Sequence, residues 1–220
     1  MKNLIILSLT LGMVVTAHAT IYSYTWSSGF DAGTGVIPDG NPTGWSDTRE
    51  LSGIPMWSIS DVNVRLNISG GWNGDLYGYL VHESGFTVLL NRVGTGGAAS
   101  EPQYSFGWST SGFGSIALDD DTANANIHAV EFPAGGPYKP DSGSGSLASF
   151  DTLNPNGSWT LFFADLAAGD TSTVVSWGLD IEAVPEPVTW ALGVFGVLAI
   201  GAGAVRRWRT RAGSARDARH

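Results

Sequence analysis

The chain has 220 residues, no cysteine and a formal net charge of −9, from 11 lysine and arginine residues against 20 aspartate and glutamate residues. This length suits one domain with additional terminal segments. The charge is unevenly distributed, because residues 20–184 hold four basic and eighteen acidic residues, whereas six arginines lie in the last fifteen residues. An acidic body of charge −14 argues against electrostatic binding of nucleic acid. The absence of cysteine excludes a disulfide scaffold, a thiol nucleophile and thiolate metal sites.

The first 19 residues have the pattern of a secretory signal peptide. Lys2 is followed by an apolar run over residues 4–15, and the segment ends in Ala17-His18-Ala19, a small-x-small signal peptidase pattern. We therefore predict export, with Thr20 as the first residue of the processed chain.

The body, residues 20–183, is dense in glycine, asparagine, serine and proline and lacks helical periodicity. Apolar and polar residues alternate over 62–68 and 175–183, as in half-buried strands. Three runs that are apolar on both faces predict central strands, at 76–81, 86–90 and 159–164. Weaker strands are expected at 21–26, 115–118, 127–132 and 146–150. These elements predict an all-β, two-sheet sandwich.

Three segments of the body share their pattern with a known family. They are residues 74–80 with 84–90 (GDLYGYL and SGFTVLL), residues 118–121 (LDDD), and residues 157–181, which include Gly157-Ser158-Trp159, Asp165, Asp170 and Trp177-Gly178-Leu179. Over residues 56–183 this pattern resembles the P domain, or P/Homo B domain, which follows the catalytic domain in kexin- and furin-like proteases. The resemblance implies a jelly-roll β-sandwich. The departures, Ser172-Thr173 and an inserted glycine- and serine-rich loop at 94–114, concern loops.

Catalysis is not expected. A Ser-His-Asp triad needs a histidine base, and the body contains only His82 and His128, neither in a triad motif. The P-domain resemblance is to a non-catalytic module, and the body leaves no room for a subtilisin-like domain. We expect both histidines at the surface or at strand edges.

Residues 188–205 are eighteen consecutive uncharged residues. At ~1.5 Å per residue they would form a helix of about 27 Å, which is just long enough to cross the hydrocarbon core of a membrane. Arginines follow at once and would hold that end in the cytoplasm under the positive-inside rule. The orienting residues are Arg206, Arg207, Arg209 and Arg211, and residues 212–220 form an Arg-rich tail.

Pro185-Glu186-Pro187 stands directly before the predicted span. Its two prolines prevent regular helix and strand and keep the peptide extended. The order of motif, span and arginines over residues 184–211 resembles the PEP-CTERM sorting signal of Gram-negative bacteria. The resemblance implies recognition by an exosortase, a membrane cysteine protease that removes the span. The body would then pass from the inner membrane to the cell surface or an extracellular polysaccharide matrix.

The acidic run Asp119-Asp120-Asp121 is the candidate metal site. Adjacent carboxylates repel one another, and a hard cation such as calcium would relieve that repulsion. The alternative is a solvated acidic turn. Asp165 and Asp170 could form a second acidic loop. No other cofactor is expected.

Aromatic residues are the candidate ligand contacts. Trp45, Trp72 and Trp108 stand in sequence contexts typical of loops and, with tyrosines such as Tyr77 and Tyr79, could stack on sugar rings. Alternatively they plug the ends of the sandwich.

Together these features predict a non-catalytic exported surface or matrix protein, with a structural or adhesive sandwich. Its expected partners are signal peptidase and exosortase, with extracellular polysaccharide as a candidate. Two other functions stay open. One is a carbohydrate-binding module that could depend on calcium, and the other is an accessory domain of a separate subtilisin-like protease.

Overall fold

The computed structural model describes residues 18–55, 57–95, 107–121, 123–133, 135–143, 146–185, 193, 196–198 and 200–202. Residues Ala19–Val184 form one compact unit. Outside the description lie residues 1–17 of the predicted signal peptide, Glu186, Pro187, the four orienting arginines and the tail 212–220. In the C-terminal unit, residues 193, 196–198 and 200–202 are helical. None of the helices described there or elsewhere is long and apolar enough to span a membrane.

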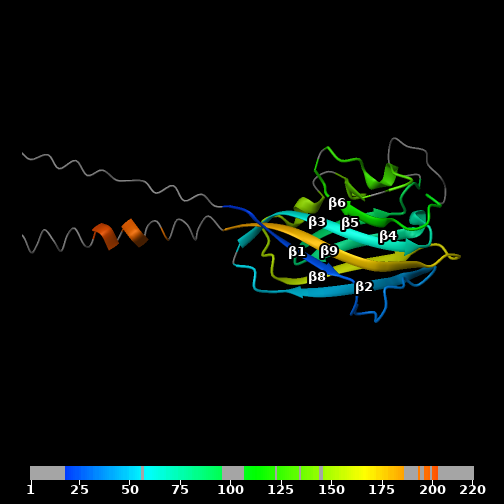
Figure 1. The fold of residues 1–220 in the computed structure, drawn as a ribbon, viewed down its shortest axis with the longest axis horizontal. Coiled ribbons are helices and arrows are strands. Elements are labelled where there is room, and N and C mark those ends of the chain that lie inside the picture. Colours follow the sequence, from blue (N-terminus) through cyan, green and yellow to red (C-terminus); the bar gives the residue numbers. More distant parts are fainter. Residues whose placement is uncertain are drawn as a thin grey trace, which may run out of the picture. The chain divides into compact units, whose positions relative to one another are not determined.

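Two β-sheets build the body (Figure 1). The strands are β1 (Thr20–Trp26), β2 (Asn41–Leu51), β3 (Trp57–Gly70), β4 (Leu76–His82), β5 (Gly85–Asn91), β6 (Gly114–Leu118), β7 (Gly135–Tyr138), β8 (Gly157–Asp165) and β9 (Ser172–Pro185). One sheet has five strands in the order β1-β9-β3-β6-β7, and the other has four in the order β2-β8-β4-β5. This arrangement confirms the predicted all-β, two-sheet sandwich.

Alternating side chains fill the space between the sheets. On β3, Val62, Val64, Leu66 and Ile68 are all at most 2% exposed, and the residues between them face outward. The largest core side chains are the indoles of Trp45, Trp159 and Trp177, which come from β2, β8 and β9.

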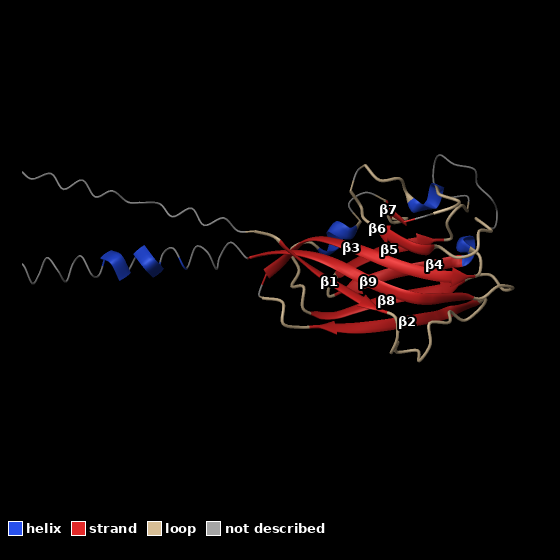
Figure 2. Cartoon of the chain, viewed as in Figure 1, coloured by secondary structure: helices blue, strands red, loops and turns tan. Residues whose placement is uncertain are grey.

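Three 3₁₀ turns connect the strands (Figure 2). They are η1 (Asn73–Asp75), η2 (Ile127–Ala129) and η3 (Leu147–Phe150). The predicted strands at 127–132 and 146–150 are therefore wrong. Side-chain caps explain the difference. Asn126 accepts the His128 N–H within η2, whereas Asp120, 27 residues earlier in the chain, accepts the Leu147 N–H at the start of η3.

Two strands, β2 and β7, were not expected from the sequence. β2 carries Pro42 and Gly44, which are typical of turns, but it lies at a sheet edge and its register shifts between Asn41 and Trp45. Edge strands tolerate proline and bulges because one side needs no ladder hydrogen bonds. β5, which was expected to be central, is the opposite edge of the same sheet.

Candidate functional site

The acidic turn after β6 uses its carboxylates within the protein. Asp119 Oδ1 accepts the Asp121 N–H at 2.9 Å, and Asp120 Oδ2 accepts the N–H groups of Leu147 at 2.7 Å and Ala148 at 3.3 Å. Asp120 therefore caps η3. Among the residues that the structure describes, no group of three or more acidic or histidine side chains is arranged to hold a metal ion. The Asp120 carboxylate is therefore engaged within the protein, and calcium binding at this turn stays a prediction.

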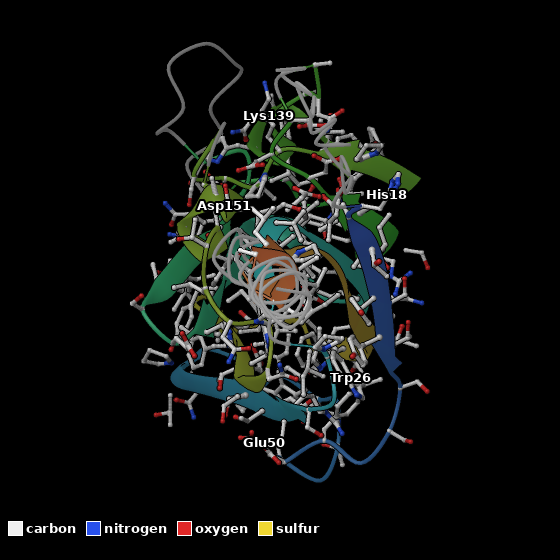
Figure 3. All side chains as sticks on the ribbon, turned by 90° about the vertical axis from the view of Figure 1, so that its left-hand side faces the viewer. His18, Trp26, Glu50, Lys139 and Asp151 are labelled. Atoms are coloured by element: carbon white, nitrogen blue, oxygen red, sulfur yellow. The ribbon has the colours of Figure 1, made fainter. Side chains whose placement is uncertain are left out.

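The charge of this turn acts on neighbouring acids. Burial, followed by the carboxylates of the turn and that of Glu182, raises the pKa of Asp61 on β3 to about 6. Burial and the nearby Asp120 also raise the pKa of Asp151, which follows η3 and is labelled in Figure 3. This part of the sandwich is therefore strongly acidic.

The three tryptophans proposed for ligand stacking differ in exposure. Trp45 and Trp108 are 2% and 4% exposed, and their indole N–H groups donate to the carbonyls of Thr34 at 2.7 Å and His128 at 3.1 Å. Both rings have packing roles and present no open face to a sugar. Trp72 is 40% exposed, so the stacking prediction remains applicable to this residue.

Both histidines of the body are buried, contrary to the expectation of surface or edge positions. His82, at the end of β4, is 0% exposed and lies parallel to the Trp159 ring with centroids 4.0 Å apart. Its ring nitrogens lie 3.0 Å from the Ser158 carbonyl and 2.7 Å from the Asn154 carbonyl. The ring thus ties β4 to β8 and its preceding loop.

His128 has a similar structural role. Its Nδ1 lies 2.9 Å from Asp141 Oδ2, and its Nε2 lies 2.8 Å from the Thr95 carbonyl. Neither histidine offers a nitrogen to solvent, since each ring nitrogen already has a protein partner.

An aromatic ridge runs across the outer face of the four-stranded sheet. It consists of Tyr77, Tyr79, Phe86 and Phe162. Tyr79 lies opposite Phe162 in the β4–β8 register, and their rings stack 4.7 Å apart at 16°. Phe86 approaches Tyr79 to 5.2 Å and is 49% exposed. The ridge is a semi-exposed apolar surface on an otherwise acidic body.

The sequence singled out Tyr77 and Tyr79 as stacking candidates but not Phe86 and Phe162, because these runs were interpreted as apolar on both faces and hence fully buried. The burial of β4 alternates instead, with Leu76, Gly78 and Leu80 inward. The available signal was the aromatic character of alternate positions, Tyr77 and Tyr79, whose amphipathic rings suit a half-exposed face. Opposite them, a glycine keeps the space for Phe162: a Cβ at Gly44, where φ is +68°, would lie 2.5 Å from its Cζ.

The other candidate site is a pair of buried aspartates at the end of the four-stranded sheet where β8 ends and β4 begins. We call Asp75 and Asp165 the acid pair; they are 5% and 0% exposed. Burial and the Asp165 charge raise the pKa of Asp75 to about 6, with Arg92 acting in the opposite direction. Burial also raises the pKa of Asp165.

The ends of the body lie side by side. β1 and β9 are antiparallel, and Thr20 pairs with Ala183, Ile21 with Glu182 and Tyr22 with Ile181. Ala19 and Thr20 are exposed, and Pro185 is the last residue of β9. The two predicted processing points therefore flank the same end of one strand pair.

These features define the body as a two-sheet β-sandwich with an aromatic ridge on one face. No protein-family model matches the sequence, and no curated protein matches it. Among solved structures, the chain is similar to the serine protease of Aeromonas sobria, both in its complex with the chaperone ORF2 and in a structure of the protease.

The extent of this likeness is limited. Sequence identity is 12% with the protease in the complex and 13% with the other structure, and the TM-score is 0.44 in both comparisons. The aligned part covers 77% and 76% of this chain but only 28% and 27% of the protease chains. The chain thus spans little more than a quarter of the protease's length.

Proposed function

We propose that the chain is a non-catalytic surface protein that is exported, sorted by an exosortase and displayed outside the cell. The P-domain-like sandwich would be its structural or adhesive module. The observation that carries this proposal is the pairing of β1 with β9 from Thr20 and Ala183 onward. Cleavage before Thr20 and near Pro185-Glu186-Pro187 would remove both terminal segments without removing any residue of the β1–β9 pairing.

The exposure of the C-terminal helical residues supports the membrane step. Val197, Leu198 and Ile200 are 71%, 55% and 76% exposed. Large apolar side chains gain free energy when they leave water, and a bilayer would provide that environment. The arginines from Arg206 onward would then fix the orientation.

Mass spectrometry of the chain from a host that contains an exosortase tests the sorting proposal. We expect an N-terminus at Thr20 and a C-terminus close to residues 185–187. In an otherwise identical host that lacks the exosortase, the C-terminal segment should remain. An intact Arg-rich tail in both hosts would contradict sorting and indicate a retained membrane anchor.

The aromatic ridge favours a second candidate function, binding of a neutral polysaccharide. The ridge carries no charge, whereas the surrounding body would repel acidic polymers. Aromatic rings pack against the apolar faces of sugars, and the exposed Trp72 is available for the same contact.

A glycan array tests this function with the variants Phe86→Ala and Trp72→Ala. The matched control is Phe132→Ala, because Phe132 is 73% exposed but lies outside the ridge. Loss of binding in Phe86→Ala or Trp72→Ala, with the control unaffected, would support a carbohydrate-binding module. Absence of binding by the natural chain would leave a structural role.

A further inference from the structure

The acid pair has an unusual environment for two carboxyl groups. Asp165 is the last residue of β8 and lies opposite Leu76 in the β4–β8 register, while the Leu166 N–H donates to the Asp75 carbonyl at 2.9 Å. Residues far apart in the sequence are thus held next to one another by strand pairing. Both side chains are withdrawn from solvent.

The hydrogen bonds at this place are incomplete. Asp165 Oδ1 accepts the Ala167 N–H at 3.2 Å, and the Gly40 backbone N–H also favours the charged form of this carboxyl group, whereas the buried Oδ2 makes no hydrogen bond of normal geometry. The side-chain oxygen of Asn73, which is 1% exposed and starts the same turn as Asp75, also lacks one. Burying a carboxylate without compensation is costly, so these oxygens indicate a missing partner.

The surrounding charges make the same point. The negative charges of Asp39 and Asp170 disfavour the ionised form of both Asp75 and Asp165. The positive charge of Arg92 favours the ionised form of Asp75. The Arg92 guanidinium donates to the Gly74 carbonyl at 3.3 Å. Four carboxylates against one guanidinium leave an excess of negative charge around buried oxygens.

We propose that Asp75 and Asp165 bind a calcium ion, with the Asn73 side-chain oxygen as a further ligand. Calcium accepts six to eight oxygen ligands in flexible geometry, including carboxylates, amide and main-chain carbonyls and water. The two carboxylates and the Asn73 oxygen would supply part of that ligand set, and main-chain carbonyls and water would supply the remainder, although no three acidic side chains converge among the described residues. This site is separate from the Asp119–Asp121 turn, whose Asp120 carboxylate caps η3. Extracellular modules often bind calcium in the 10⁻⁴ to 10⁻³ M range, which suits an exported protein.

Thermal unfolding of the full chain in detergent tests the proposal, with calcium chloride alone as the probe. After chelation with EDTA, calcium at a hundredfold excess over Kd should raise Tm by about 5 to 10 °C at pH 7. Isothermal titration should give one bound ion. Magnesium should act more weakly, because it demands octahedral geometry and keeps its water.

The variants locate the ion. Asp75→Asn and Asp165→Asn should abolish the calcium response, while replacing all three of Asp119, Asp120 and Asp121 by Asn should preserve it. Near-UV circular dichroism reports whether each variant folds. A second comparison uses two variants at exposed residues. Asp170→Asn should raise the calcium Kd severalfold, and its matched control Asp121→Asn should leave the Kd unchanged.

Three results would overturn the site. They are an unchanged Tm of the natural chain with calcium, a response that survives in both acid-pair variants, and a response lost with the Asp119–Asp121 substitutions. Asp75→Asn and Asp165→Asn variants that are more stable than a calcium-insensitive natural chain would show that the pair is a site of uncompensated negative charge and binds no ion. If the acid-pair variants fail to fold, the comparison of Asp170→Asn with Asp121→Asn decides the question.

Discussion

Asp47 shows how a charged residue can hold the core of this sandwich together. It lies on β2 with 0% exposure, yet its carboxylate accepts the Trp177 indole N–H at 2.6 Å, the Arg49 Nε–H at 2.7 Å and the Asp31 N–H at 3.0 Å. Trp177 belongs to the other sheet, so this carboxylate links the two layers. A buried charge with three donors is well compensated.

Asp47→Ala should lower the free energy of unfolding by about 3 kcal/mol or more, because the Arg49 guanidinium and the Trp177 indole would lose their buried partner. Urea denaturation followed by tryptophan fluorescence measures the change. The control is Asp180→Ala, which breaks the more exposed pair with Arg65 (3.3 Å) and should cost less than about 1 kcal/mol. Equal losses in the two variants would contradict the role of Asp47.

Asp61 provides a pH-dependent prediction. Its folded-state pKa is raised from 3.8 to about 6, so the folded protein binds a proton more readily than the unfolded chain between pH 4 and 6. Stability should therefore fall as the pH rises through this window and stay low above it. Asp61→Asn removes the unfavourable free energy of the ionised carboxylate. It should increase the free energy of unfolding by about 1 kcal/mol at pH 7, after allowance for solvent screening.

The same substitution should have only a small effect at pH 3.5, where Asp61 is mostly protonated in both the folded and the unfolded state. Denaturation curves of the two proteins at pH 3.5 and pH 7 measure the difference. A gain of equal size at both pH values would show that charge is not its cause.

At the scale of elements, close packing between β4 and β8 depends on a missing side chain. Gly78 pairs with Phe163, and a Cβ at this position would collide with the Phe163 ring and lie 3.1 Å from the Phe162 carbonyl. Phe163 is 0% exposed and has no free space into which it could move without displacing the core.

Gly78→Ala should therefore destabilise the protein by about 2 kcal/mol through overpacking. Its Tm relative to that of the natural chain is the measurement. Val175→Ala, at a 42% exposed position on β9, is the control and should change stability by no more than about 0.5 kcal/mol. An unaffected Tm in Gly78→Ala would mean that the sheet can shift to accept the extra methyl group.

A strand or turn could be predicted when its own local sequence pattern determines its structure, and could not be predicted when contacts with distant residues determine it. β3 and β9 carry regular alternation over many residues, so local pattern identifies them. β2 does not, because its core positions include the charged Asp47, whose partners come from Trp177 and Asp31. The turns η2 and η3 were mistaken for strands because their apolar residues are buried while side-chain caps, from Asn126 and Asp120, set the backbone.

The candidate sites were less accessible to sequence reasoning than the fold. The aromatic ridge depends on which face of β4 and β8 points outward, and a continuous apolar run does not reveal that choice. The acid pair depends on strand register, because Asp75 and Asp165 become neighbours only when β4 pairs with β8. The sequence suggested a second acidic loop at Asp165 and Asp170, which identified one member of the acid pair but not Asp75.

At the scale of the whole molecule, the net charge of −9 averages over segments with opposite character. Residues 20–184 carry −14, and the six C-terminal arginines lie beyond the last strand. The fold is consistent with this separation, because β1 pairs with β9 at one edge of the five-stranded sheet through residues of the acidic body alone. The terminal segments are therefore not needed to complete either sheet.

Two truncations of the chain test this independence. A chain that starts at Thr20 and stops after Pro187 should unfold within about 0.5 kcal/mol of the full chain, because no strand residue is lost. A chain that stops after Leu179 loses the pairing of Asp180–Ala183 with Thr20–Ser23 and the buried side chain of Ile181. Removing this much of a core strand should cost more than about 3 kcal/mol.

Urea denaturation of both truncated chains and the full chain gives the comparison. Processing near Pro185-Glu186-Pro187 requires the body to stay folded once the C-terminal segment is gone, so the result bears directly on the sorting proposal. Unfolding of the chain that stops after Pro187 would show that the terminal segment supports the sandwich, and removal by an exosortase would then be untenable. Stable folding of the chain that stops after Leu179 would instead show that β1 and the end of β9 are dispensable for the sandwich.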